Sequence, residues 1–440
     1  MCLEHNQRIK EYLTTVCSQV KWREVHEPIR QELLTHISDI VEEARQNGVS
    51  QAEAIEKALV QMGDPVIVGI QLHKTHKPRV EWGLAALAGS LVILGLLTIY
   101  VLESSGLVRS NAPLFIKSFL SLLLGLMCIV GLYFFDYRKI KSFSGVIYIG
   151  TVCFMVLTLL FGQGHNGQFI VLTIGFLRLS FFGVTPFLFA IALSGIFSQC
   201  DQQQPRELWR ALFLLVIPVM LYLLAPSVST AIIYLIVVFT LLLASGAKRT
   251  YIIWGITGPL ALVLGTIIQN PYRMQRLITL FNPFGDPLGS GYQQVKSLEM
   301  IRSAGLWGQG FTFPARTLPE IHTEMVFTYL VYTFGWLAGL AIIAAAVALV
   351  IRMIRLARQV KDTYARLLVT SVTSIFLVQF FWNIFMTIGL MPFMGIGLPF
   401  ISYSGSQLLI QMIAIGLMLS IYRRKDIGGV PAGTLPSRPK

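Results

Sequence analysis

The chain has 440 residues, of which 54% are hydrophobic and 13% are charged. Soluble globular domains carry about a quarter charged residues, so this composition excludes a soluble globule and indicates an integral membrane protein. The formal net charge is +13, but the first 80 residues hold 10 Lys and Arg against 11 Asp and Glu. The positive excess therefore belongs to the membrane portion, where it lies in short loops. This distribution favours a topology signal over a nucleic-acid-binding surface.

Residues 1–78 are predicted to form a small soluble helical domain. Apolar residues recur at helical spacing in residues 9–20, 29–44 and 52–61, and Gly and Pro interrupt the pattern between and after them. We therefore expect about three helices. The acidic helix and the Met-Gly-Asp-Pro turn at residues 62–65 resemble the permease-prefix domain of some bacterial membrane proteins, which implies an adaptor or regulatory role and no chemistry. Because no cleavable signal opens the chain, we expect this domain in the cytoplasm.

Ten apolar stretches follow, most of them long enough for the roughly 20 residues that cross a bilayer as a helix. They lie near residues 83–102, 113–135, 143–162, 181–198, 208–224, 228–246, 250–268, 324–351, 365–390 and 401–422. With the N-terminus inside, the Lys and Arg clusters fall in the inner loops and obey the positive-inside rule. We expect an all-α, polytopic protein with about ten transmembrane helices in residues 83–425. Both termini, including the tail 426–440, are then cytoplasmic, and one long loop, residues 269–323, is extracytoplasmic.

That loop carries several basic side chains beside apolar ones, among them Arg273, Arg276 and Lys296. Guanidinium groups pair bidentately with phosphate oxygens, so such a surface suits a ligand with a phosphate head and a lipid tail. The alternative is that these residues anchor the loop to anionic lipid headgroups. Composition alone favours the anchoring interpretation.

Two acids, Glu320 and Glu324, lie between the loop and the eighth span, and an acid at membrane depth is by default a functional-site hypothesis. Thr323 is expected to cap the eighth span, which would place Glu324 in the first helical turn, where the helix dipole favours an acid. Local physics alone favours this capping role. His322 is interpreted as a hydrogen-bonding interface residue, because no second His or Cys stands at metal-ligand spacing. We predict no metal site, although a divalent cation shared by Glu324 and lipid phosphates is left open.

The last loop, residues 395–406, reads Gly-Ile-Gly-Leu-Pro-Phe-Ile-Ser-Tyr-Ser-Gly-Ser and mixes glycine with hydroxyl side chains at the mouth of a span. Irregular backbone at this depth is tolerated where protein or a water-filled cavity satisfies it, so Ser402 and Ser406 are candidates to line a polar pocket. Small residues also allow tight helix packing. The sequence leaves both interpretations open.

The order of these motifs resembles the SEDS family, the FtsW, RodA and SpoVE proteins of bacterial division, shape and sporulation. The resemblance covers about residues 83–425. It rests on the loop 270–297, the run Leu-Pro-Glu-Ile-His-Thr-Glu at 318–324, Asn383 with Gly389 and Pro392, and the run Leu-Pro-Phe-Ile-Ser-Tyr-Ser-Gly-Ser at 398–406. It implies a peptidoglycan glycosyltransferase in the cell membrane that polymerises lipid II, the undecaprenyl diphosphate-linked disaccharide, at the outer face. It also implies a class B penicillin-binding protein as partner.

The resemblance also implies roles for individual residues. Glu324 stands where the family has its presumed catalytic aspartate, which makes it the expected general base. The expected substrate-binding residues are Arg178, Arg273, Arg276, Gln293, Lys296, Asn383, Ser402 and Ser406. The basic residues among them would stabilise the departing lipid diphosphate, and Arg178 matches the arginine that precedes the family's first motif.

The chain departs from the family pattern at several positions, and the loss of two acids supports an alternative. Leu188 and Ser227 stand where the family has acids, and Lys296 replaces a glutamine of the loop motif. The missing acids favour a non-catalytic scaffold or regulator of wall synthesis, whereas the acid retained at Glu324 favours an enzyme. A lipid II flippase ranks last, because the spans offer few polar residues along a path across the bilayer.

Overall fold

The structure is a computed structural model that describes residues 6–75, 80–108, 113–161, 163–165, 168–170, 172–174, 177–179, 181–200, 205–311 and 318–425. Side chains are not described for residue 24, for the strands between residues 163 and 179, or for residues 205–212, and the predicted tail 426–440 lies outside the described residues. The chain divides into two compact units, Met1–Val80 with Tyr422–Lys440, and Glu81–Ile421. The helices of residues 6–75 are called the N-terminal unit, and Glu81–Ile421 the membrane unit.

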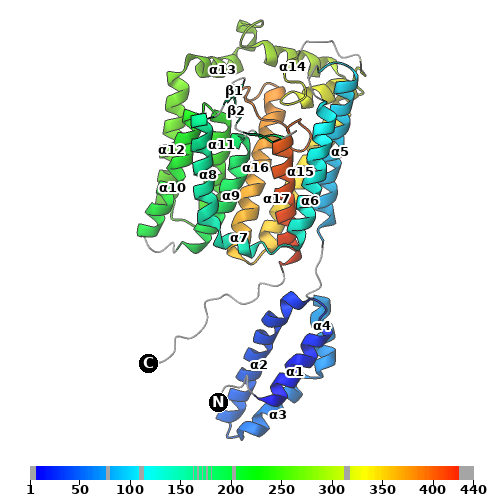
Figure 1. Cartoon of the computed structure of the whole chain (residues 1–440), viewed down its shortest axis with the longest axis vertical. Helices are drawn as coiled ribbons and strands as arrows, with labels where there is room; N and C mark the ends of the chain where they lie inside the picture. Colours follow the sequence, from blue (N-terminus) through cyan, green and yellow to red (C-terminus); the bar gives the residue numbers. More distant parts are fainter. Residues whose placement is uncertain are drawn as a thin grey trace. The chain divides into compact units, whose positions relative to one another are not determined.

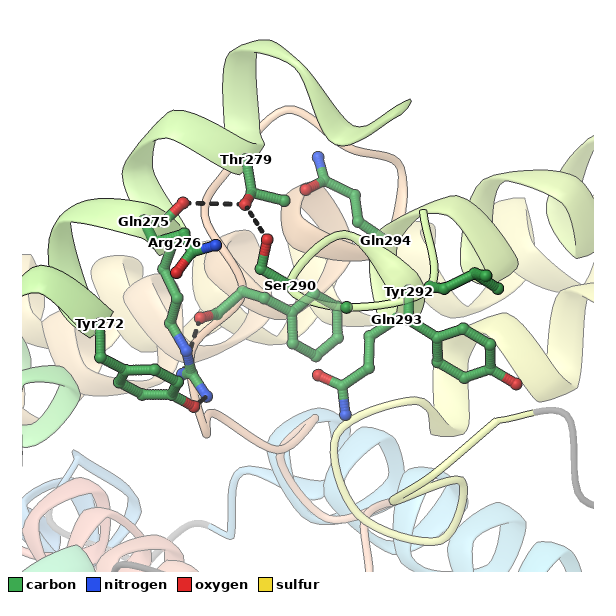
Figure 2. A pocket seen from close by; sticks show the side chains of 11 residues that line it. Tyr272, Gln275, Arg276, Thr279, Ser290, Tyr292, Gln293 and Gln294 are labelled. Atoms are coloured by element: carbon green, nitrogen blue, oxygen red, sulfur yellow. Dashed lines mark hydrogen bonds between the residues drawn. The ribbon is translucent and has the colours of Figure 1, made fainter. Parts of the chain in front are cut away.

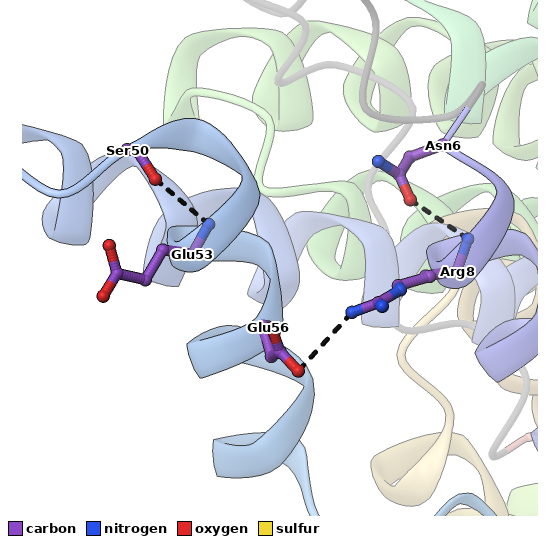
Figure 3. Close-up of polar contacts among 5 residues, drawn as sticks. All are labelled: Asn6, Arg8, Ser50, Glu53 and Glu56. Atoms are coloured by element: carbon purple, nitrogen blue, oxygen red, sulfur yellow. Dashed lines mark hydrogen bonds and ion pairs between the residues drawn. The ribbon is translucent and has the colours of Figure 1, made fainter.

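The N-terminal unit is a small helical bundle (Figure 1). Its elements are α1 (Gln7–Gln19), η2 (Arg23–Val25), α2 (His26–Gln46), α3 (Gln51–Met62) and α4 (Pro65–Thr75). Two polar side chains cap helix starts, since Asn6 accepts from the N–H of Arg8 and Ser50 from the N–H of Glu53 (Figure 3). The buried side chains recur every three or four residues on α1, α2 and α3 and form one apolar core.

The sequence predicts about three helices here, and the structure adds α4. The Met-Gly-Asp-Pro segment ends α3 and also starts the next helix, because the Asp64 carboxylate accepts from the N–H groups of Val66 and Ile67. Pro65 suits the first helical position, where a missing N–H costs nothing. The Met-Gly-Asp-Pro segment therefore contains the start of a helix that apolar periodicity alone did not indicate.

The membrane unit is a bundle of long helices packed side by side (Figure 1). They are α5 (Trp82–Ser104), α6 (Leu114–Phe134), α8 (Ser144–Phe161), α9 (Phe181–Gln199), α10 (Pro205–Leu224), α11 (Val228–Ser245), α12 (Arg249–Gln269), α15 (Val326–Gln359), α16 (Thr363–Thr387) and α17 (Gly405–Arg423). Within the described residues, nine of them are long and apolar enough to cross a membrane, and α10 contributes the shorter apolar stretch Phe213–Leu224. The prediction of an all-α polytopic membrane protein is confirmed. The most buried span is α16, which packs against α9, α11 and α15.

Short strands occupy the connection between α8 and α9. β1 (Gln163–His165) pairs with β2 (Gln168–Ile170), and β3 (Leu172–Ile174) pairs with β4 (Leu177–Leu179), each pair antiparallel. α7 (Arg138–Ser142) is a short helix that connects α6 to α8.

Helix α15 is interrupted at Gly335, whose φ of 80° lies in the left-handed region that favours glycine. The interruption frees backbone groups near residues 332–337, and the segment 305–310 pairs with them: Gln309 N–H donates to Tyr332, and Trp336 N–H donates to Gly305. A Cβ on Gly335 would lie 2.1 Å from the Leu306 carbonyl oxygen. The long predicted loop is therefore fixed to the bundle by backbone hydrogen bonds.

The loop has helices of its own, namely α13 (Pro271–Phe281), η3 (Pro283–Gly285) and α14 (Tyr292–Ser303), at one end of the bundle (Figure 1). Buried Ser297 of α14 donates to the carbonyl of Thr387 on α16 at 2.8 Å and bonds with the hydroxyl of Thr328 on α15 at 2.7 Å. These contacts fix α14 against the two helices that lead into the candidate site.

Candidate active site

The segment 318–325 is a turn that precedes α15. The helix begins at Val326 with Met325 as N-cap, so the prediction that Thr323 caps this span is wrong. Thr323 instead donates its hydroxyl to the Glu320 carboxylate at 2.8 Å, and the N–H groups of Thr323 and Met325 both donate to the Glu320 carbonyl. Glu320 has a φ of 54°, a strained conformation for a residue other than glycine, and such strain concentrates at functional sites. Glu324 therefore lies before the first helical turn.

The carbonyl oxygens of three successive residues in this turn are each held by a donor from another element. The donors are the N–H of Tyr403 to His322 at 2.8 Å, the hydroxyl of Ser402 to Thr323 at 2.5 Å, and the side-chain amide of Asn383 to Glu324 at 2.9 Å. Asn383 is fully buried on α16, and its amide nitrogen also donates to the Ile396 carbonyl at 2.8 Å. The backbone of Glu324 is thereby positioned by α16 and by the loop 395–404.

The Glu324 carboxylate is partly buried beside Gly395. A Cβ on Gly395 would lie 2.9 Å from Glu324 Oε1, so a glycine here lets the acid occupy its place without a shift. The pKa of Glu324 is raised to about 7, mainly by burial; the charge of Glu320 contributes to this rise, and the charge of Arg276 opposes it. The group can therefore accept a proton near neutral pH.

A pocket of about 500 Å³ opens between α13 and α14. It is lined by Tyr272, Gln275, Arg276, Thr279, Leu288, Gly289, Ser290, Tyr292, Gln293, Gln294 and Phe393. Figure 2 shows the Thr279 hydroxyl bonded to the Ser290 hydroxyl and to the Gln275 carbonyl, which ties the two walls together. Aromatic rings, amides and hydroxyls dominate the lining.

Arg276 belongs both to this pocket and to the surroundings of Glu324. Its guanidinium donates to the Phe393 carbonyl at 3.2 Å and to the Tyr272 hydroxyl at 2.6 Å (Figure 2), and it lies 4.8 Å from the centre of the Tyr272 ring. Phe393 lines the pocket two residues before Gly395, and the Arg276 charge acts on the pKa of Glu324. Arg276 is the only positively charged residue among the described side chains that line the pocket.

The remaining predicted site residues lie in different places. Gln293 lines the pocket. Lys296 does not, and pairs instead with Glu299 one turn along α14, at 2.7 Å. Arg273 donates to the Thr266 carbonyl near the end of α12, at 3.4 Å, and also lies outside the pocket lining.

Two further predicted residues complete the set. Ser406 is buried near the start of α17 and does not line the pocket. Arg178 pairs with Thr173 through the backbone of the β3–β4 hairpin, and its side chain lies outside the described residues.

Sequence reasoning missed several pocket residues, notably Tyr272, Gln275 and Thr279. They line one face of α13, which starts at the Asn270 cap followed by Pro271. A helix start at Asn-Pro followed by polar residues at helical spacing is a usable signal. Gly395 begins the loop 395–406, but its contact with Glu324 depends on two elements that meet only in the fold.

The described residues contain no group of three or more His, Cys, Asp or Glu side chains that could hold a metal ion. Burial lowers the pKa of His322, with Glu320 acting in the opposite direction. The ring is therefore largely neutral at pH 7 and packs against Tyr403, with the ring centres 5.7 Å apart. This arrangement fits an interface residue better than a cationic one.

A family model and the sequences of known proteins indicate the same family for this chain. Residues 81–427 match the model of the FtsW, RodA and SpoVE family, described as cell cycle proteins. The chain is 30% identical over 296 residues to a probable peptidoglycan glycosyltransferase FtsW of Coxiella burnetii, covering 64% of this chain and 78% of that one. It is 26% identical over 417 residues to the peptidoglycan glycosyltransferase RodA of Treponema pallidum, covering 76% and 96%.

Solved structures share the fold. A chain from a structure described as a peptidoglycan synthase complex that coordinates polymerization and crosslinking superposes with a TM-score of 0.67 at 23% identity, covering 79% of this chain and 98% of that one. The rod shape determining protein RodA of Thermus thermophilus gives a TM-score of 0.59 at 21% identity, covering 79% and 97%. The family match begins at residue 81, so it leaves the N-terminal unit outside.

Proposed function

The chain belongs to the FtsW, RodA and SpoVE family of cell cycle proteins, and on this basis we propose that it is a peptidoglycan glycosyltransferase. Its substrate is the lipid-linked disaccharide precursor lipid II, which it polymerises into glycan strands. The observation that carries the chemistry is a largely buried carboxylate, Glu324, whose pKa is raised to about 7 and whose charged neighbour Arg276 lines a polar pocket.

Glu324 acts as the general base in this proposal. It removes the proton from the acceptor sugar hydroxyl while that oxygen attacks the anomeric carbon of the donor sugar. The bond from that carbon to the lipid diphosphate breaks, and the diphosphate leaves with the electron pair. A base is most effective when its pKa lies near the working pH, and a pKa of about 7 meets that condition.

The pocket that Arg276 lines is the proposed sugar-binding region. Tyr272, Tyr292 and Phe393 offer aromatic faces, while Gln293 and Gln294 offer amide donors and acceptors. Arg276 supplies positive charge for the diphosphate, since guanidinium groups pair with phosphate oxygens. Asn383 and Ser402 act on catalysis indirectly. Both side chains donate to backbone carbonyls and hold Glu324 in position.

Orientation and partners are further parts of the proposal. The positive-inside pattern supports a cytoplasmic N- and C-terminus and an extracytoplasmic loop 269–323. The similarity to a chain of a synthase complex supports a partner that crosslinks the strands, of the class B penicillin-binding type. For Arg273 and Lys296 we propose the role that composition favours, which is to anchor the loop to anionic lipid headgroups.

A second candidate is a non-catalytic scaffold that binds the precursor. Leu188 and Ser227 favour it, because neither can replace an acid in proton transfer or cation binding. Leu188 is partly buried on α9. Ser227, which precedes α11, donates its hydroxyl to the Ala225 carbonyl at 3.1 Å.

One experiment separates the two candidates. The purified full-length protein is given lipid II, alone and with cognate transpeptidases, and strand formation is compared for wild type, Glu324→Gln and the control Glu299→Gln. Loss of a general base costs about 10²- to 10⁴-fold in rate, so Glu324→Gln is expected to lose this much while Glu299→Gln keeps activity. Equal activity in all three proteins would exclude Glu324 as base. Precursor binding without turnover by the wild type, with every partner, would support the scaffold.

A further inference from the structure

Helix α4 of the N-terminal unit differs in character from the other helices of that unit. The outward faces of α1, α2 and α3 carry many charged side chains, whereas α4 reads Pro-Val-Ile-Val-Gly-Ile-Gln-Leu-His-Lys-Thr and has Lys74 as its one Lys, Arg, Asp or Glu. Apolar side chains lie on more than one side of α4, and a helix with this pattern is normally covered on more than one side. One side of α4 is covered within the unit.

That covered side packs on α1 and on the core. A Cβ on Gly69 would lie 2.7 Å from the Gln19 side chain and 2.8 Å from the Val16 carbonyl oxygen, and Val68 and Leu72 pack against the core cluster. His73 accepts a hydrogen bond from the Lys21 N–H. These contacts fix the rotation of α4 about its axis.

Within the part of the chain that the structure describes, the opposite side of α4 is exposed. Val66, Ile67 and Ile70 are 41%, 58% and 44% exposed. Residues three and four apart share a helix face, so the three side chains form one apolar patch. Exposed Lys74 lies one turn further along the same face. We call these four residues the α4 face.

Two features of the chain indicate what covers the α4 face. Thr75 ends α4 and Trp82 starts the first span, so seven residue steps, at most about 25 Å of extended chain, connect this helix to the membrane boundary. Trp82 is 74% exposed, and tryptophan concentrates at the lipid–water interface. From Pro65 to Val80 the sequence has Lys74, Lys77 and Arg79 and no acid, which complements anionic lipid headgroups.

We propose that the α4 face binds the lipid surface of the membrane, with Val66, Ile67 and Ile70 inserted at the level of the headgroups and Lys74 paired with anionic lipid. The attachment fixes the N-terminal unit to the bilayer independently of the chemistry at Glu324. The short tether makes it effectively intramolecular, so a patch of three apolar side chains suffices.

The test uses the full-length protein in nanodiscs of phosphatidylglycerol and phosphatidylethanolamine. The environment-sensitive amino acid dansylalanine replaces Ile67 on the α4 face or, as a matched control, the exposed Thr35 on α2. Emission at position 67 is expected to shift to the blue and to be quenched at least about threefold more by doxyl-labelled lipid than emission at 35, whereas aqueous iodide quenches mainly position 35. Equal iodide quenching at both positions would overturn the proposal.

A second pair of variants identifies the occupant. Val66→Glu with Ile70→Glu is expected to abolish lipid quenching at 67, while the exposed control Gln61→Glu preserves it, with folding checked by circular dichroism. Should the double variant unfold, the unmodified background with its two probe positions still decides. Protection of position 67 from iodide without quenching by doxyl lipid would mean that protein, such as a second copy of this chain, covers the α4 face, and would also overturn the proposal.

Discussion

The side-chain amide of Asn383, fully buried on α16, donates to the backbone carbonyl of Glu324 at 2.9 Å. The same nitrogen donates to the Ile396 carbonyl at 2.8 Å. One side chain from a central span thus joins the turn that carries the acid to the loop that contains Gly395. Because both acceptors are carbonyls, the amide orientation is fixed.

Replacing Asn383 with Asp keeps the size of the side chain but breaks at least one of the two hydrogen bonds, because a carboxylate cannot donate and a protonated carboxyl has a single O–H donor. Buried unpaired polar groups cost about 1–3 kcal/mol each, so the melting temperature should fall. Misplacement of Glu324 by about 1 Å should lower the polymerisation rate on the order of 100-fold. Gln379→Leu, one helical turn away on α16, is the matched control. If Asn383→Asp lost no more activity than the control, the positioning role would be excluded.

Gly395→Ala tests the close approach of the acid. The new Cβ would lie 2.9 Å from Glu324 Oε1, and the flexible end of the Glu side chain can move away with little cost in stability. We expect an unchanged melting temperature and a rate reduced by about tenfold or more, because the base is displaced. In a Glu324→Asp background the shorter side chain leaves room for the methyl group, so Gly395→Ala should cost less there. A purely additive double-mutant cycle would contradict direct contact.

The pH dependence of polymerisation should reveal the neighbours of Glu324. A base works when ionised, so the rate is expected to rise with pH through about 7. Glu320 raises the pKa of Glu324 and Arg276 lowers it. Glu320→Gln should therefore shift the midpoint of the profile to lower pH, and Arg276→Gln should shift it to higher pH. Shifts in the same direction would show that the two charges do not act through Glu324.

Stability should vary with pH for the same reason. Glu324 binds its proton more tightly in the folded protein, where its pKa is about 7, than at the ordinary value of 4.5. Its contribution to stability is therefore present below pH 4.5 and is lost as pH rises through 7, by about 3 kcal/mol in total. Glu324→Gln should lose less stability between pH 5 and pH 8 than wild type or Glu299→Gln. Parallel melting curves for all three proteins would contradict the raised pKa.

The orientation of the loop can be measured in whole cells. Leu288 is 88% exposed on that loop. Leu288→Cys is expected to react with an impermeant thiol reagent before the cells are opened, whereas Thr35→Cys in the N-terminal unit should react only afterwards. The reverse order would refute the proposed topology.

Apolar periodicity and length were enough to predict the spans, because a helix in lipid must satisfy its own backbone hydrogen bonds within about 20 residues. Motif order was enough to identify the family, and it singled out Glu324 as the candidate base. Helix α4 escaped prediction because its signal is the Asp64-Pro65 start and not a polar and apolar alternation.

The tertiary structure decided what surrounds Glu324. Thr323 could be an N-cap or part of a turn on local sequence alone, and the choice depends on donors from Asn383, Ser402 and Tyr403, which lie some 60 to 80 residues further along the chain. Arg273, Arg276 and Lys296 are equivalent as sequence, yet only Arg276 reaches the pocket lining. Hydrogen bonds and pKa shifts act over a few ångströms, so they depend on which distant segments meet, and that is fixed only when the helices pack.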